Sequence, residues 1–150
     1  MSAPARQLKL FAPDTVPEIT AGADLAAIFL KAINAMGEAP QDGDVIVFAQ
    51  KIVSKAEGQA VDLNTISPGV GARALATETS KDPRVVELIL AESSEIVRKR
   101  EGLIIARHRN GYVAANACID ISNAGGDEIA VLLPEDADRS AKTIAEDILE

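Results

Sequence analysis

Hydrophobic and polar positions change most abruptly between Asp44 and Gly58. Residues 45–49 (Val-Ile-Val-Phe-Ala) are apolar without interruption. Such a run predicts a strand buried on both faces. Four polar side chains follow it directly: Gln50, Lys51, Ser54 and Lys55. A buried strand that ends in cations and hydrogen-bond donors suits an anion such as phosphate, although a core strand followed by a solvated turn explains the same pattern.

The rest of the chain alternates between helical and extended patterns. Helices are expected at residues 23–35, 67–79, 82–93 and 138–150, from apolar spacing and from Ser67-Pro68 and Asp82-Pro83 as helix starts. The last helix should bury Ala141, Ile144, Ala145, Ile148 and Leu149. Shorter extended runs predict strands at 8–11, 60–63, 103–107, 112–115 and 129–133, with a hairpin turn at Asn110-Gly111. Residues 95–99 fit either a helix or a strand.

These elements predict an α+β fold, a mixed sheet with flanking helices, because strict βαβ alternation is absent. A length of 150 residues fits a single domain spanning 1–150 with a hydrophobic core of its own. The last helix has no Gly or Asn stop, and Glu146, Asp147 and Glu150 lie at the end where the helix dipole disfavours acids. That ending fits a chain cut from a longer one.

Composition narrows the classes of function. A net charge of −8 with one Tyr, three Phe and no Trp is unfavourable for nucleic-acid binding. No apolar run has the length of a membrane span, and the N-terminus lacks the apolar region of a signal peptide. The single cysteine fits a reducing cytoplasm. One histidine and one cysteine argue against a zinc site and an internal disulfide. Five of the fifteen basic residues lie between Arg98 and Arg109, a pattern typical of a solvated face.

A second polar cluster lies at residues 116–123 (NACIDISN). Its Asp and Asn oxygens suit magnesium or manganese, which needs only one or two carboxylates beside substrate phosphates. An Asx-rich turn explains the same residues. No glycine-rich phosphate loop of the GxxxxGK[ST] or GxGxxG type is present. His108, beside the hairpin turn, is expected at the surface, and Cys118 is expected to pack as a small core residue.

Together these segments resemble the coenzyme F420 gamma-glutamyl ligase family, in its N-terminal portion. The similar segments run through most of the chain in the family's order: VPEI at 16–19, AQKIVSKAEG at 49–58, KDPRVVELILAES at 81–93, GYVAANACIDISN at 111–123 and LLPEDADRSA at 132–141.

The resemblance implies a cytoplasmic ligase that depends on GTP and on Mg²⁺ or Mn²⁺, with a supporting K⁺ left open. Such enzymes add L-glutamate to the coenzyme F420 precursor through an acyl phosphate, which turns a poorly electrophilic carboxylate into one with a good leaving group. The family forms an intertwined homodimer with its site near the subunit interface.

Residues carry over one position at a time. The nucleotide-contacting positions of the family match Val16, Pro17, Glu18, Ile19, Gln50, Lys55 and Asn123. Asp120 matches a metal ligand. Lys55 and Asp120 are therefore the candidate catalytic residues, and Lys55→Ala should weaken nucleotide binding more than Lys51→Ala.

Two positions depart from the family pattern. The family often has a small hydroxyl residue at Gln50 and glycine at Cys118, and the second departure bears on the backbone just before Asp120. Family members also continue past the last helix into a strand whose Asp-Thr pair completes the metal site. The alternatives to a ligase are therefore a non-catalytic nucleotide- or coenzyme-binding fragment, one subunit of a split ligase that needs a separate C-terminal half, and a plain structural domain.

Overall fold

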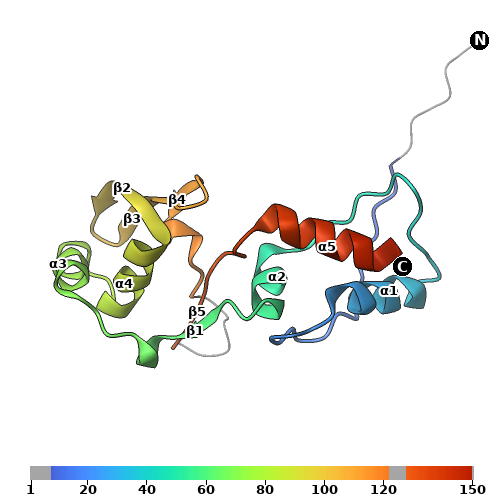
Figure 1. The fold of residues 1–150 in the computed structure, drawn as a ribbon, viewed down its shortest axis with the longest axis horizontal. Coiled ribbons are helices and arrows are strands. Elements are labelled where there is room, and N and C mark those ends of the chain that lie inside the picture. Colours follow the sequence, from blue (N-terminus) through green and yellow to red (C-terminus); the bar gives the residue numbers. More distant parts are fainter. Residues whose placement is uncertain (1–7, 122–127, 150) are drawn as a thin grey trace, which may run out of the picture.

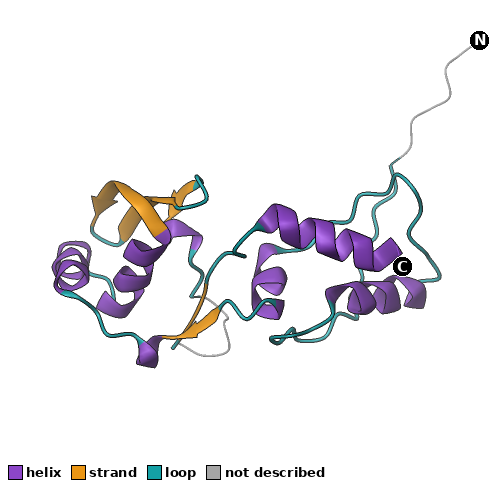
Figure 2. Cartoon of the chain, viewed as in Figure 1, coloured by secondary structure: helices purple, strands orange, loops and turns teal. Residues whose placement is uncertain are grey.

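The fold is α+β, as expected, in a computed structural model that describes residues 8–121 and 128–149. The strands form two small antiparallel sheets, β2-β3-β4 and β1-β5 (Figures 1 and 2). The elements in order are α1 (Leu25–Ala35), α2 (Gln50–Ala56), β1 (Ala60–Asp62), the 3₁₀ turn η1 (Leu63–Thr65), α3 (Val70–Thr79), α4 (Pro83–Glu92), β2 (Ser93–Arg100), β3 (Leu103–His108), β4 (Val113–Ala115), the turn η2 (Asn116–Cys118), β5 (Ile129–Val131) and α5 (Ala137–Leu149).

The elements gather in two groups along the long axis of the molecule (Figure 1). One group, called here the sheet lobe, contains α3, α4 and the sheet β2-β3-β4. The other, called here the helical lobe, contains α1, α2, α5 and the segment before α2. The β1-β5 pair lies between them (Figure 2).

The sheet lobe has a closed hydrophobic core. Helix α4 begins as predicted, with Asp82 accepting a hydrogen bond from the Arg84 amide and Pro83 in the first turn. Its apolar stripe then places Val86 and Ile89 in the core, where both are fully buried. Helix α3 begins at Val70 with Gly69 as N-cap, so the predicted N-cap at Ser67 is wrong by two residues.

The predicted hairpin is confirmed, but the prediction of a surface His108 is wrong. His108 is only 1% exposed. Its Nε2 lies 3.2 Å from an oxygen of Glu92, the last residue of α4, and its Nδ1 accepts a hydrogen bond from the Asn110 amide. Because Nδ1 accepts, Nε2 carries the proton and donates to Glu92. The hairpin folds onto the end of α4, which buries the histidine that the turn signal placed outside.

The helical lobe has a much smaller core. Its buried cluster is Ile19, Leu25 and Val53, with other apolar side chains only partly buried around it. The α1 helix confirms the prediction and is capped by Asp24, which accepts from the Ala27 amide. No described residue of α5 is buried, so the predicted buried face of that helix is wrong.

Two predicted strands are absent from this lobe. Residues 45–49 have no regular secondary structure and pair with no strand among the described residues, and Val45 and Val47 are 86% and 87% exposed. Residues 8–11 are likewise irregular, with Leu8 and Leu10 exposed. An apolar run indicates a preference for burial, but it does not show that a neighbouring strand is available for pairing. The described residues provide no such strand for either segment.

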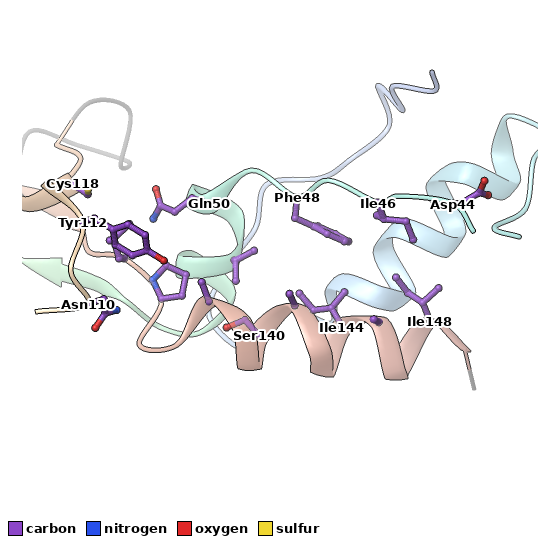
Figure 3. Close-up of a pocket in the computed structure, with 16 residues that line it drawn as sticks. Asp44, Ile46, Phe48, Gln50, Asn110, Tyr112, Cys118, Ser140, Ile144 and Ile148 are labelled. Carbon is purple, nitrogen blue, oxygen red and sulfur yellow. The ribbon is translucent and has the colours of Figure 1, made fainter. Parts of the chain in front are cut away.

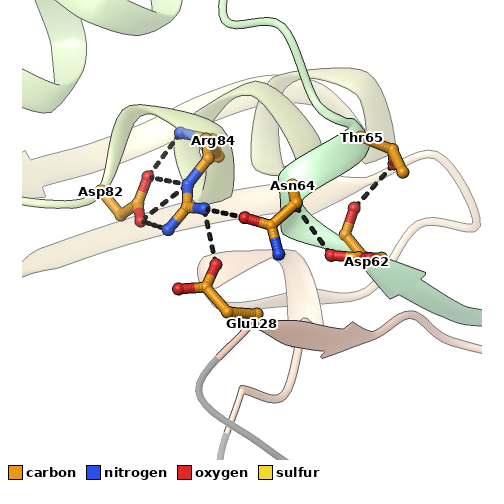
Figure 4. Close-up of polar contacts among 6 residues, drawn as sticks. All are labelled: Asp62, Asn64, Thr65, Asp82, Arg84 and Glu128. Carbon is orange, nitrogen blue, oxygen red and sulfur yellow. Dashed lines mark hydrogen bonds and ion pairs between the residues drawn. The ribbon is translucent and has the colours of Figure 1, made fainter.

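Arg84 ties the sheet lobe to the β1-β5 connector (Figure 4). Its guanidinium lies 2.6 Å from a carboxylate oxygen of Asp82 and 2.6 Å from one of Glu128, and it donates to Asn64 in η1 at 3.3 Å. The pairing lowers the pKa of the Asp82 carboxyl, mainly through the hydrogen bond from Arg84. Residues from three separate segments therefore meet on one side chain.

Candidate functional site

The polar residues after the apolar run form a helix that the sequence prediction missed. Helix α2 spans Gln50–Ala56, and Gly58 follows it with φ +74°. A helical signal was available in the i, i+1 and i+4 spacing of Ile52, Val53 and Ala56 before that glycine. The helix places Lys51 and Lys55 on one face, because residues four apart are neighbours on a helix surface.

Lys51 joins α2 to Asp120. The Lys51 ammonium lies 2.6 Å from an Asp120 carboxylate oxygen, and the two side chains are 30% and 29% exposed. The backbone of Asp120 is fixed by two hydrogen bonds with Val131, its N–H donating at 3.0 Å and its carbonyl accepting at 2.8 Å. Lys51 precedes Asp120 by more than sixty positions in the sequence, so only the tertiary fold brings these two residues together.

Lys55 joins the same helix to the loop at residues 16–19. Its Nζ lies 2.5 Å from a Glu18 carboxylate oxygen, and this hydrogen bond lowers the pKa of Glu18. The Lys55 side chain is 14% exposed whereas that of Glu18 is 79% exposed. Within this loop, Ile19 is buried in the small core while Val16 and Pro17 are exposed. The loop is therefore anchored at one end and open to solvent at the other.

Two further predicted site residues are Gln50, which the structure describes, and Asn123, which it does not. The Gln50 amide nitrogen donates to Ser54 at 2.6 Å and to the Leu132 carbonyl at 3.2 Å, so it already has two protein partners. Asn123 and its neighbour Ser122 lie outside the described residues. Of the predicted residues that are described, α2 brings together Lys55, the 16–19 loop and Asp120.

The turn before Asp120 is conformationally strained. Asn116, Ala117 and Cys118 all have positive φ, at 52°, 53° and 62°. The left-handed region costs a non-glycine residue about 1–2 kcal/mol. Strain of this kind collects at functional sites. No pattern in the sequence predicts this strain, apart from the family's usual glycine at the position of Cys118.

Two side chains of this turn have unusual surroundings. The Asn116 Oδ1 atom is buried without a hydrogen-bond partner among the described residues. Cys118 is only partly buried and lines a cavity, so the prediction of a core cysteine is wrong. Partial burial raises the pKa of the Cys118 thiol, which keeps it protonated.

The described residues supply too few ligands for a complete metal site. They contain no cluster of three or more His, Cys, Asp or Glu side chains that would hold an ion. Asp120 supplies one carboxylate, and Lys51 already balances its charge. A magnesium or manganese ion bound there needs further ligands from a substrate or from another polypeptide segment.

A cavity of about 560 Å³ runs from this region along α5 (Figure 3). One end is bordered by Gln50, Tyr112 and Cys118, and the other by Ile46 and Ile148. Its walls are mostly apolar, and no lysine or arginine lines it among the described residues. The charged face of α2 and the apolar groove are thus different surfaces.

The fold and the two ion pairs define an α+β protein with a candidate anion-binding face on α2. The chain belongs to the F420-0:gamma-glutamyl ligase family, whose model matches residues 14–150. It is 45% identical to the coenzyme F420:L-glutamate ligase of Methanothermobacter thermautotrophicus over 137 residues, 91% of this chain and 54% of that protein. The ligase of Methanopyrus kandleri is 48% identical over 104 residues, 69% of this chain and 41% of that protein. The resemblance found in the sequence is confirmed.

The chain spans about half the length of the curated relatives it matches, including 54% of the Natronomonas pharaonis ligase at 38% identity. Among the residues that the structure describes, no helix is both long and apolar enough to cross a membrane.

Proposed function

We propose that this chain supplies the phosphate-binding side of a GTP-dependent ligase that adds L-glutamate to the coenzyme F420 precursor. The observation that supports the proposal is the placement of two lysines on one face of α2, one paired with Asp120 and the other with Glu18 of the 16–19 loop. Segments that match the family's nucleotide and metal positions meet on this helix although they lie far apart in sequence. The names of the relatives supply the substrates.

The lysines suit the chemistry of the proposed reaction. The precursor's carboxylate oxygen attacks the γ-phosphorus of GTP, the bond to the β-phosphate oxygen breaks, and GDP leaves. The glutamate amine then attacks the acyl carbon, loses a proton and displaces phosphate. Both steps gather negative charge on phosphate oxygens, which positioned cations stabilise. Lys55 is the stronger candidate because its side chain is half as exposed as that of Lys51, so solvent screens its charge less.

Among the described residues, Asp120 is the one proposed metal ligand. A divalent ion would neutralise phosphate charge, and the resemblance leaves open a supporting K⁺. Because the described residues provide one carboxylate, the steps above rest on the lysines. Homodimer formation, which the family resemblance implies, would be one source of further ligands, and a separate C-terminal half would be another.

A second candidate is a nucleotide-binding module, or one subunit of a split ligase, without activity of its own. The lone carboxylate at Asp120 and the half-length match to the relatives favour it. An assay of GTP-dependent glutamate addition separates the candidates when this chain is measured alone and with the unmatched half of the Methanothermobacter protein. Activity of the chain alone supports the complete ligase, and activity only of the mixture supports the split one.

Binding is tested by titrating GTP with and without Mn²⁺ while following the melting temperature. We expect GTP to raise it, since a ligand that binds only the folded state stabilises that state. Lys55→Ala should reduce affinity by about tenfold, the loss of one charged contact, and Lys51→Ala should reduce it less. Equal losses of GTP affinity in the two variants would contradict the assignment of Lys55. A melting temperature that neither GTP nor Mn²⁺ changes would contradict the proposal of a nucleotide site.

A further inference from the structure

Residues 45–48, called here the open strand, have the form of a β-strand without a sheet. They run alongside α5 without forming a helix or a paired strand, and their side chains alternate in exposure (Figure 3). Val45 and Val47 are exposed to solvent, whereas Ile46 and Phe48 are partly buried and point toward α5 (Figure 3). This alternation is the period of two that a strand shows when one face is covered and the other is bare.

The backbone of the open strand is also unpaired. Among the described residues, none of its N–H or C=O groups takes part in a hydrogen bond within the protein. Backbone donors and acceptors in a strand are a template for another strand. A chain that adds a strand here gains both main-chain hydrogen bonds and side-chain contacts on the valine face.

The covered face of the open strand is itself incompletely packed. Ile46 and Phe48 form one wall of the cavity of about 560 Å³, and Ile144 and Ile148 of α5 form the opposite wall. Helix α5 has an apolar stripe but no buried residue. Contiguous apolar surface of this kind marks an interaction site.

We propose that the open strand and this groove are the docking surface for the part of the family's ligase domain that lies beyond the region matched by this chain. Two observations select a polypeptide over a small ligand. Successive unpaired backbone groups suit pairing with another extended chain, and a groove without lysine or arginine has no cation to pair with a phosphorylated coenzyme precursor.

The length of the relatives identifies the occupant. The matched region is only 54% of the Methanothermobacter ligase, so nearly half of that protein is available to contribute a strand and an apolar face. The proposal goes beyond the ligase reaction, because docking would occur equally in an inactive copy. Its failure would leave the nucleotide titration unaffected, and the reverse is also true.

The test joins this 150-residue chain to the unmatched part of a relative in two ways. The unmatched part of the Methanothermobacter ligase is co-expressed with the chain, and separately a chimera is made in which this chain replaces the 137 matched residues. Hydrogen exchange is then compared with that of the chain alone. Within residues 45–48, the alternate amides that face the added strand should exchange at least about tenfold more slowly in both assemblies, because each of them gains a backbone hydrogen bond.

A pair of valine substitutions separates strand docking from general surface effects. Val47 and Val70 are both 87% exposed, and Val70 lies on α3 in the sheet lobe. Val47→Asp should weaken the two-piece complex by about tenfold or more, and Val70→Asp should change it less than twofold, with both variants melting like the parent chain.

Three results would overturn the proposal. One is unchanged exchange at residues 45–48 in the chimera. Another is equal weakening of the complex by both valine substitutions. The third is protection of the same amides in the chain alone at high concentration but not in the chimera, which would assign the surface to a second copy of this chain.

Discussion

The two lobes differ in how far their hydrophobic cores are closed. The cluster centred on the sheet lobe contains fourteen buried residues, among them Val86, Ile89 and Ile104 without any exposure. The buried cluster of the helical lobe contains three, counted over residues 8–121 and 128–149 in both lobes. Helices α4 and α5 are both amphipathic, yet five residues of α4 are buried and none of α5 is. The difference lies in what each helix is packed against.

This contrast separates the formation of a helix from its burial. Local signals such as the Asp24 and Asp82 caps start helices in both lobes. Most of the stability of a helix in a protein comes from packing its apolar face. In the helical lobe this packing is incomplete among the described residues. The lobe would therefore gain stability if another polypeptide segment covered its apolar surface, as proposed above.

The largest expected effect comes from removing one core side chain from each lobe. Ile89→Ala should lower the free energy of unfolding by about 2–5 kcal/mol, because the fully buried side chain leaves a cavity in a closed core. Ile144→Ala should lower it by less than about 1 kcal/mol, because that side chain already borders open space. Urea unfolding of both variants measures the difference.

Equal losses for the two variants would mean that the helical lobe is packed as tightly as the sheet lobe, which would contradict the difference between the two cores. The matched substitution of isoleucine by alanine makes the removed apolar volume the same in both cases. Circular dichroism of the folded variants checks that neither has lost α4 or α5 before the titration starts.

The local parts of the fold were predictable from sequence. Capping residues and periodicity identified α1, α4 and α5, and Asn110-Gly111 identified the β3-β4 hairpin. The segment at 45–49 was not predictable, because its apolar run is the same whether a sheet is present or absent. His108 was misplaced for a similar reason, since its burial depends on the contact of the hairpin with Glu92.

The candidate site also has features that could be predicted from the sequence and features that could not. The charged residues of α2 and Asp120 stood out in sequence as clusters of suitable chemistry. Their pairing did not, because the contact of Lys51 with Asp120 and that of Lys55 with Glu18 depend on tertiary packing. The left-handed turn at 116–118 carries no composition signal, since neither alanine nor cysteine favours positive φ.

A smaller effect is expected at the junction between the lobes. Arg84→Ala should lower the free energy of unfolding more than Arg139→Ala, because Arg84 joins three segments, whereas the ion pair of Arg139 is with Glu135, a near neighbour just before α5. Guanidinium chloride would screen these ion pairs, so urea is the better denaturant.

The pH dependence checks the cause of that loss. The Asp82 pKa is depressed in the folded protein below its ordinary 3.8, so its contribution is present above that value and is lost as pH falls through the folded pKa. The difference between the parent chain and Arg84→Ala should therefore be full near neutral pH and shrink in strong acid. A difference that stays constant across this range would show that the arginine acts through packing and not through its charge.

The smallest expected effect comes from the turn where the two lobes meet. Ala117 and Ile119 belong to the large core, while Cys118 faces the groove with φ +62°. Cys118→Gly should raise the free energy of unfolding by about 1 kcal/mol, because glycine adopts this conformation without strain and the partly buried thiol contributes little packing. Ala114→Gly, in the adjacent β4 strand, is the control and should lower stability. If Cys118→Gly also lowers stability, the thiol's contacts in the groove outweigh the backbone strain, and the groove is better packed than the rest of the helical lobe.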